Sequence, residues 1–430
     1  MDTQEHDMLD DDSVELLAEA SEIIRSAKKW IIVLSVAAVL SWVLSGAVLI
    51  LTSHARIETA DARGYPPADS YRTNSGPWGR LEHLPVVIAP PLENVSENIE
   101  DFSASAVWRF PNVGPAELPV LFESISLSDS LRTKLLSMAQ IDISLRGMVI
   151  RPSREFVLGL SRIDRGKLYT ALCGYMENGD QQKQFVFRGT SPEQWFTGSG
   201  VSPDTRKLVE PLIYRHRGFM YFADLRSIAE TVNPPSQLPR LVRALSRDAT
   251  VLVHLKLDKN DNIDALVKYW GCGGREQQVR PILESLVRNG VEREINIVHL
   301  LPPLARRKLY TYSPRLDAET RPKRDCNWTA ANFFNETPDD RFCDPKEVVK
   351  MLRNDYRRVH SSLQLGDIAV VLDEKKMSVH SAVYVADEIY FHKCGPGASA
   401  PWTLAREKDL ASYYPRTKQG SIWFYRRKDL

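Results

Sequence analysis

The longest uninterrupted apolar run of the chain covers residues 30–52 and contains no charged residue. At about 1.5 Å per residue, a helix of this length can cross a hydrocarbon core of about 30 Å. Trp30 would lie at the level of the headgroups, where aromatic side chains are common. The competing interpretation, a cleaved signal peptide, requires an apolar stretch of only about 7–15 residues. The pattern therefore predicts one uncleaved transmembrane helix.

The residues on either side of this run predict its orientation. Residues 1–29 are acidic and polar, with helical amphipathic spacing in their second half, and form a predicted cytoplasmic tail. The basic residues next to the run are Arg25, Lys28 and Lys29 before it and Arg56 and Arg63 after it. Positive charge close to the membrane favours the N-terminus inside. We therefore expect a single-pass membrane protein with its C-terminal bulk outside the cytoplasm.

Two further segments lie between the membrane and the C-terminal quarter. Residues 53–105 are punctuated by Pro and Gly and predict a linker or stalk. Residues 106–315 alternate short apolar stretches with turn residues and predict a mixed α/β domain. Its predicted helices are 128–138, 239–246 and 277–288. Its predicted strands are 156–163, 167–176, 184–188, 251–257, 263–269 and 295–301.

Two hairpins are predicted inside this middle domain. Asn178 and Gly179 separate one pair of predicted strands, and the acidic and amide residues 258–262 separate another. No reactive set of side chains is apparent in the domain.

The last segment, 316–430, begins with helical spacing and continues with alternating apolar positions. The predicted helices are 326–334 and 344–360, and the predicted strands are 365–372, 379–385, 389–392 and 421–425. Helices followed by an antiparallel sheet are an α+β order. The predicted fold class is therefore α+β, with a single N-terminal transmembrane helix, a mixed α/β middle domain and a C-terminal α+β domain.

Composition excludes some functions. The 430 residues carry a net charge of +1, and no nucleic-acid-binding motif accompanies the basic clusters, so no nucleic acid is expected as a partner. The five cysteines include no CxxC pair, so no zinc site is expected, and no other metal or cofactor is required. An odd number of cysteines fits one free nucleophile with up to two disulfides, and it fits five thiols equally well.

Cys326 is the strongest candidate for chemistry. It follows Asp325 at the start of a predicted helix, where free backbone N–H groups and the positive end of the dipole favour a thiolate. A nucleophile also needs a base that a third group orients. His380 and His392 lie on adjacent strands of a short predicted hairpin, which brings the imidazoles close together. A lone cysteine or strand histidine is usually structural, so the prediction depends on all three residues together.

These residues, in this order, resemble the NlpC-type cell-wall cysteine peptidases. That family has a cysteine after aspartate at a helix start, a Gly-Asp strand entry, a histidine on a strand, and a polar residue, often histidine, on the next strand. The matching positions are Asp325 with Cys326, Gly366 with Asp367, His380 and His392. The likeness covers about the last quarter of the chain and implies a papain-like α+β fold there. Asn327 and Trp328 stand where the family usually has Ser and Gly.

The resemblance implies a cysteine endopeptidase acting on peptidoglycan stem peptides or crosslinks. Together with the predicted membrane span, it implies attachment to a bacterial inner (cytoplasmic) membrane, with the C-terminal bulk in the periplasm or outside. Wall binding, partner binding and covering of the catalytic cleft all stay open as the role of the middle domain. Cys326 is the expected nucleophile, His380 the base and His392 its orienting group, with Tyr310 or Tyr312 as an assisting tyrosine. The expected partners are the peptidoglycan peptide, the membrane, and a protein bound by the middle domain. Two alternatives stay open: a non-catalytic, membrane-tethered scaffold that binds wall or a partner, and another acyl-transfer or amidase reaction on the same cysteine.

Overall fold

The computed structural model describes residues 71–72, 75–95, 105–189, 191–288, 293–315, 323–373, 375–413 and 422–430. The chain divides into two compact units, Met1–Ala62 and Arg63–Leu430, and all described residues belong to the second. The predicted cytoplasmic tail and the predicted membrane span at 30–52 lie outside the described residues. Within the described ranges, no helix is long and apolar enough to cross a membrane.

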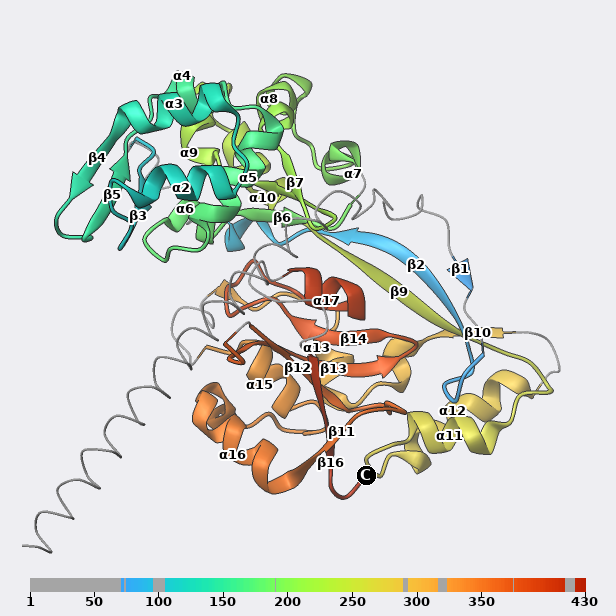
Figure 1. The fold of residues 1–430 in the computed structure, drawn as a ribbon. Coiled ribbons are helices and arrows are strands. Elements are labelled where there is room, and N and C mark those ends of the chain that lie inside the picture. Colours follow the sequence, from blue (N-terminus) through green and yellow to red (C-terminus); the bar gives the residue numbers. More distant parts are fainter. Residues whose placement is uncertain are drawn as a thin grey trace, which may run out of the picture. The chain divides into compact units, whose positions relative to one another are not determined.

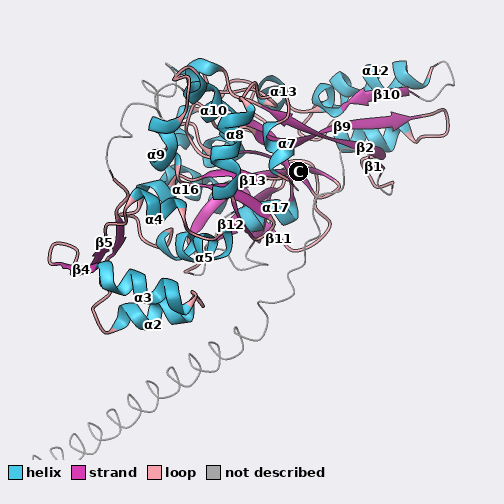
Figure 2. Ribbon diagram, turned by 90° about the horizontal axis from the view of Figure 1, so that it is seen from above, coloured by secondary structure: helices cyan, strands magenta, loops and turns pink. Residues whose placement is uncertain are grey.

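A long antiparallel ladder joins the first described strands to the middle of the chain. The sheet has the order β1 (Tyr71–Arg72), β2 (Arg80–Ile88), β9 (Asp248–Leu257) and β10 (Arg293–Asn296). The register of β2 on β9 runs from Arg80 opposite Lys256 to Ile88 opposite Asp248, and the two strands lie side by side in Figures 1 and 2. The range predicted as a stalk therefore contributes a nine-residue strand to a sheet.

The C-terminal part of the chain forms a six-stranded antiparallel sheet. Its order is β11 (Tyr356–Val359), β16 (Ile422–Arg427), β12 (Ile368–Leu372), β13 (Ser378–Ala386), β14 (Ile389–Lys393) and β15 (Trp402–Arg406). The helical elements of this part are α15 (Cys326–Ala331), η6 (Asp340–Cys343), α16 (Pro345–Asp355) and α17 (Glu407–Tyr413). Helix α15 packs against β13 and β14, and the fully buried Trp328 of α15 belongs to the core on that side.

Residues 105–247 form two smaller antiparallel sheets and the helices around them. The strands are β3 (Trp108–Phe110), β5 (Gly147–Ile150) and β4 (Ala139–Asp142) in one sheet, and β6 (Phe185–Phe187), β8 (Phe219–Phe222) and β7 (Tyr214–His216) in the other. The α-helices are α2 (Glu117–Ser124), α3 (Asp129–Met138), α4 (Arg154–Leu158), α5 (Arg162–Leu172), α6 (Gly179–Gln182), α7 (Pro192–Phe196), α8 (Pro203–Val209), α9 (Leu225–Ile228) and α10 (Gln237–Leu245). Short 3-10 turns are η1 (Leu92–Asn94), η3 (Glu210–Leu212) and η4 (Ala229–Thr231).

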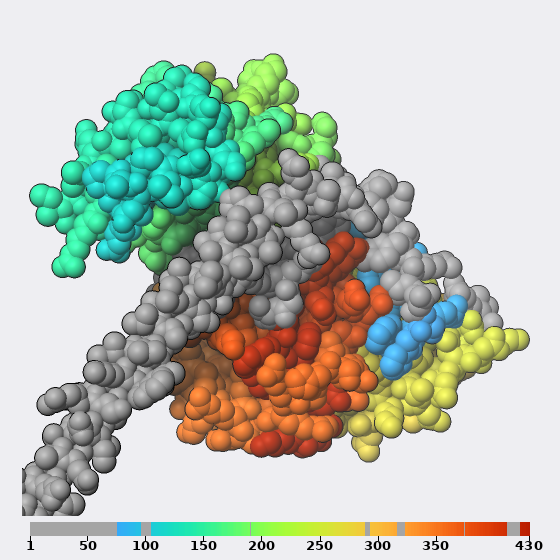
Figure 3. All heavy atoms as spheres, viewed as in Figure 1, coloured from blue at the N-terminus to red at the C-terminus, as the bar shows by residue number. Residues whose placement is uncertain are grey.

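One hydrophobic core joins the ladder to the C-terminal sheet. It includes Leu81 of β2, Val253 of β9, Trp328 of α15 and Leu404 of β15. The connecting helical elements are α11 (Ile263–Trp270), α12 (Glu276–Val287), η5 (Ile297–Leu300) and α13 (Pro303–Lys308). Figure 3 shows the yellow residues of this connection adjoining the orange and red C-terminal residues. Described side chains therefore pack together on both sides of residue 315, where the sequence predicts a domain boundary.

The predicted fold class is wrong. The prediction was an α+β chain with a transmembrane helix, a mixed α/β middle domain and a papain-like C-terminal domain. The described residues instead form one mixed α/β structure with several sheets, in which helices and strands alternate along the chain. They contain no helix that could span a membrane. The physical reason for the difference is the shared core, because segments far apart in sequence complete each other's apolar faces.

Several predicted strands of the middle segment are helices, and side-chain capping explains why. Ser153 and Ser161 accept hydrogen bonds from the backbone N–H groups of Phe156 and Asp164, and so start α4 and α5. Asn262 caps α11 in the same way through the N–H of Ala265. Asn262 lies in a range predicted as a turn and Ser161 in a range predicted as a strand, but both act as N-caps. Both predicted hairpins of this segment are therefore absent from the described structure.

Candidate active site

Cys326 is the first residue of α15, and Asp325 is its N-cap. The Asp325 carboxylate accepts hydrogen bonds from the backbone N–H of Asn327 at 2.8 Å and of Trp328 at 3.1 Å. These are the N–H groups that the sequence analysis expected to stabilise a thiolate. The cap also places a negative charge on the residue next to the sulfur. Local folding of the helix start and activation of the cysteine therefore compete for the same donors.

The two histidines meet inside the C-terminal sheet. β13 and β14 form the hairpin that the sequence predicts, with Val383 opposite Phe391. His380 and His392 are 1% and 2% exposed, and Nε2 of His380 lies 3.1 Å from Nδ1 of His392. One ring nitrogen of each imidazole is used in this contact. The atom of His380 that is left for contact with another group is Nδ1.

The Cys326 sulfur lies beside the strand that carries His380. The backbone N–H of Ser381, the residue after His380, hydrogen-bonds to the sulfur of Cys326. The Ser381 hydroxyl donates to Oδ1 of Asn327 at 2.7 Å. Ser381 of β13 therefore contacts both of the first two residues of α15. The structure thus brings the three predicted residues into one buried region, although Cys326 and His380 are 54 residues apart in the sequence. Of the two candidate tyrosines, Tyr310 donates its hydroxyl to the carbonyl of Val251 at 2.6 Å.

The electrostatics of this region favour uncharged forms. Burial, and after it the neighbouring Asp325 charge, raise the pKa of the Cys326 thiol to about 12. Burial, with a smaller contribution from the Arg188 charge, lowers the pKa of His380 to about 3. Burial, and after it the neighbouring His380, hold the pKa of His392 well below its usual value. Near neutral pH the Cys326 thiol and both imidazoles are therefore uncharged, and they do not form a thiolate–imidazolium pair.

Three further polar residues extend the contact between the histidines. Nε2 of His392 lies 3.2 Å from Oγ1 of Thr403 on β15. The Thr403 hydroxyl is 3.5 Å from Oδ2 of Asp248, the first residue of β9. Oδ1 of Asp248 accepts from Nη2 of Arg188 at 2.7 Å. We refer to these five residues, His380, His392, Thr403, Asp248 and Arg188, as the polar network.

Three residues of the polar network, Thr403, Asp248 and Arg188, were not predicted from the sequence. Thr403 could have been found by extending the strand alternation one strand beyond His392, because the two residues are opposite each other in the register. Asp248 and Arg188 have no local signal, since they come from segments predicted to belong to another domain. Their position follows only from the packing of β9 against β15, where Thr250 Oγ1 donates to the Leu404 carbonyl at 2.9 Å.

A second cysteine borders the histidines. Sγ of Cys394 lies 3.5 Å from Nδ1 of His392. Burial raises the pKa of the Cys394 thiol to about 12, so this group is also protonated near neutral pH. All five cysteines lie in the described part of the chain, and none of them forms a disulfide. The described residues also contain no cluster of His, Cys, Asp and Glu arranged to hold a metal ion.

The Gly-Asp pair that contributed to the family resemblance has a clear architectural role. Gly366 has φ of +97°, and a Cβ atom there would lie 2.2 Å from Cζ of Phe334. Asp367 is 1% exposed and accepts two hydrogen bonds from Arg426 of β16, at 2.8 and 2.6 Å. The pair therefore directs the chain into β12 beneath the ring of Phe334, and it joins two strands of the sheet through a buried ion pair.

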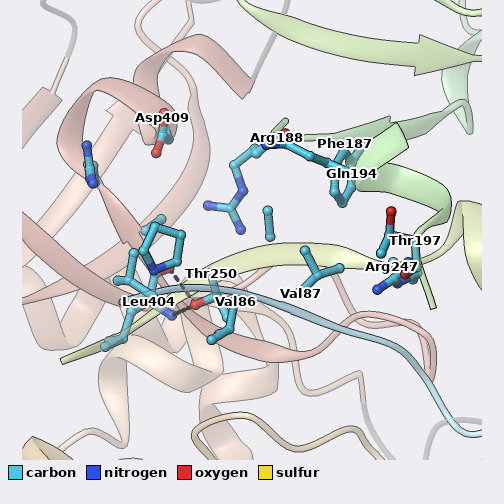
Figure 4. Close-up of a pocket in the computed structure, with 15 residues that line it drawn as sticks. Val86, Val87, Phe187, Arg188, Gln194, Thr197, Arg247, Thr250, Leu404 and Asp409 are labelled. Atoms are coloured by element: carbon cyan, nitrogen blue, oxygen red, sulfur yellow. Dashed lines mark hydrogen bonds between the residues drawn. The ribbon is translucent and has the colours of Figure 1, made fainter. Parts of the chain in front are cut away.

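Two cavities lie at the outer end of the polar network. The larger, about 850 Å³, is lined by Asp248 and Cys394 and by three basic side chains. These are Lys183, Arg226 and Arg247. The smaller, about 270 Å³, is mainly apolar and is lined by Arg188 and by residues of β2, β9 and β15. Figure 4 shows the side chain of Arg188 extending into it, with the hydrogen bonds between Thr250 and Leu404 at its base.

Comparisons with known protein families, with curated proteins and with solved structures found no match to this chain. The functional interpretation therefore depends on the residues of the site and on their geometry.

Proposed function

We propose that the chain is a cysteine hydrolase that cleaves peptide bonds in peptidoglycan stem peptides or crosslinks. Cys326 is the nucleophile, His380 the general base and His392 the group that orients it. The observation that carries this proposal is the buried 3.1 Å contact between the imidazoles of His380 and His392, beside the strand position where Ser381 contacts the Cys326 sulfur. An imidazole oriented by a second group next to a thiol is the arrangement that nucleophilic catalysis requires.

The reaction begins from the neutral thiol. Because Nε2 of His380 faces His392, Nδ1 is the atom that accepts the thiol proton as the Cys326 sulfur attacks the carbonyl carbon. The backbone N–H of Cys326 at the start of α15 would stabilise the oxyanion. His380 then gives the proton to the departing amine, and a thioester forms. Water, deprotonated by the same nitrogen, hydrolyses the thioester and releases the carboxylic acid and the free thiol.

The larger cavity supports a peptide substrate with carboxylate groups. Its volume of about 850 Å³ suits several residues of an extended peptide. Lys183, Arg226 and Arg247 line it, and stem peptides of cell walls carry free carboxylates. Attachment to a bacterial inner membrane, with the catalytic part outside the cytoplasm, stays a prediction that depends on residues 30–52.

Release of muropeptides tests the proposal. The purified full-length chain is incubated with isolated sacculi, and soluble products are separated and identified by mass spectrometry. Cys326→Ala is expected to abolish release. Cys343→Ala is the matched control, because Cys343 is a free cysteine at the end of η6 and outside the polar network. Release that persists in Cys326→Ala, or no release from the wild-type chain, contradicts the proposal.

One observation favours the second candidate, a non-catalytic scaffold that binds wall or a partner. Cys326 is only 8% exposed, and its pKa is raised to about 12. A buried, protonated thiol is typical of a structural cysteine. If this candidate is correct, the full-length chain sediments with sacculi without releasing products, and Cys326→Ala sediments equally well.

A further inference from the structure

The polar network contains enough information to assign the protons on both imidazoles. It begins at Asp248, whose carboxylate can only accept hydrogen bonds when it is ionised. Oδ1 of Asp248 accepts from Arg188, which is 5% exposed and supplies the balancing charge. Oδ2 faces the hydroxyl of Thr403. The dipole of that hydroxyl is therefore directed with its hydrogen toward Asp248, and its oxygen is left to accept.

The next contact then has a fixed direction. Because Thr403 donates to Asp248, its oxygen accepts from His392, so the proton of the neutral His392 ring is on Nε2. Nδ1 of His392 is then an acceptor. Two neighbours agree with this assignment, because both Nε2 of His380 and the protonated Sγ of Cys394 lie within donor distance of Nδ1. Because sulfur is both a weak donor and a weak acceptor, the tautomer is decided by Asp248 and Thr403 and not by Cys394.

We propose that Thr403 and Asp248 are positioning residues, which fix the tautomers of His392 and His380 so that the unprotonated nitrogen of His380 is Nδ1. The tautomer itself follows from the hydrogen bonds alone. Its catalytic meaning rests on the proposed function, in which Nδ1 of His380 takes the thiol proton. The opposite tautomer places a proton on that nitrogen and removes the base without moving any heavy atom.

The arrangement also assigns a role to residues outside the C-terminal sheet. Asp248 begins β9, and Arg188 follows β6 of the middle segment. Both are supplied by the part of the chain for which the sequence suggested no chemistry. The middle segment would thus take part in the reaction through the orientation of two rings.

Nitrogen-15 NMR of the imidazoles tests the tautomers directly. The full-length chain is labelled at its histidine rings and studied in detergent at pH 7, and ring signals are assigned with single histidine substitutions. In the wild-type chain, we expect His380 and His392 each to show a protonated Nε2 and an unprotonated Nδ1. A protonated Nδ1 on either ring overturns the proposal.

Substitutions give the second part of the test. Thr403→Val removes the hydroxyl at nearly constant volume and is expected to mix the two tautomers, whereas Thr403→Ser retains the wild-type pattern. Thr250→Val is the control, because Thr250 is a buried hydroxyl on the adjacent strand that bonds to Leu404 and lies outside the polar network. An unchanged tautomer pattern in Thr403→Val, or the same mixing in Thr250→Val, contradicts the role of Thr403.

Asp248→Asn tests the same hydrogen-bond chain from its other end, and it can be used if Thr403→Val does not fold. Arg188 holds the oxygen of the new amide at the Oδ1 position, so the NH₂ group faces Thr403 in place of Oδ2. Thr403 must then accept from Asn and donate to His392, which reverses both tautomers. We expect the protonated nitrogen to move to Nδ1 in both rings, with folding unchanged by circular dichroism. Retention of the wild-type tautomers contradicts the proposal.

Activity distinguishes this inference from the proposed function. If the wild-type chain releases muropeptides, Asp248→Asn is expected to lower kcat by on the order of 10²–10⁴-fold, as a misplaced imidazole proton does in related chemistry, with little change in KM. If the tautomers respond as expected but no sacculus product is released by the wild-type chain, the proposed function fails and the assignment of the protons stands.

Discussion

Burial and the charge of Asp325 together determine how the reactivity of Cys326 depends on pH, and the charge can be tested with one substitution. An ordinary cysteine has a pKa near 9.0, and that of Cys326 is raised to about 12. At pH 7 the thiolate fraction is then about 10⁻⁵ and not about 10⁻², a difference of about a thousandfold. Asp325→Asn removes the adjacent charge but keeps an oxygen that can cap α15. We expect the pKa to fall and the thiolate fraction at pH 7 to rise on the order of tenfold.

The assay is alkylation of Cys326 by iodoacetamide, followed by peptide mass spectrometry, which separates the five cysteines. In the wild-type chain, the rate constant should rise about tenfold per pH unit from pH 7 to 10, without a plateau. Asp344→Asn is the matched control, because Asp344 caps α16 through the N–H of Lys346 and is not adjacent to a candidate nucleophile. A plateau of the alkylation rate constant below pH 8 in the wild-type chain would contradict the raised pKa. An equal change of this rate in Asp325→Asn and Asp344→Asn would contradict the role of the Asp325 charge.

Three further predictions concern stability, each measured by urea denaturation of the full-length chain. Gly366→Ala should destabilise it by about 2–4 kcal/mol, because the positive φ and the ring of Phe334 both oppose a Cβ; Gly179→Ala, with open space around it, is the control. Arg426→Leu should cost about 3–5 kcal/mol by removing the positive charge that pairs with the buried Asp367 carboxylate, and a loss below 1 kcal/mol contradicts this. Burial lowers the pKa of His380 from 6.5 to about 3, so the ring is neutral in the folded chain near pH 7. Its contribution to the free energy of unfolding is therefore complete above pH 6.5 and is lost as pH falls toward 3. If the free energy of unfolding of His380→Gln falls with the same slope in that range, this prediction is wrong.

The C-terminal hairpin could be predicted from the sequence because its signals are local. Alternating apolar positions and a short polar turn determine β13 and β14, and the pairing of these strands brings His380 to His392. The start of α15 at Cys326 is equally local, since Asp325 is a common type of N-cap. What the sequence could not show is that the Asp325 carboxylate itself accepts from the backbone N–H groups of Asn327 and Trp328. The same carboxylate that starts the helix opposes a thiolate at its first residue.

The middle segment could not be predicted as well because its polar residues have two uses. Ser153, Ser161 and Asn262 are compatible with turns or with N-caps, and only the tertiary structure decides between them. The position of Asp248 next to Thr403 depends on packing between segments about 155 residues apart. No periodicity or motif contains that information.

The pairing of β2 with β9 determines when this protein can finish folding. About 160 residues separate the end of one strand from the start of the other. At roughly 5–20 residues per second of synthesis, β2 waits on the order of ten seconds for its partner. β15, which supplies Thr403, emerges later still. The buried histidines therefore reach their final surroundings only after β15 has been synthesised, and any chemistry that depends on Thr403 begins after that point.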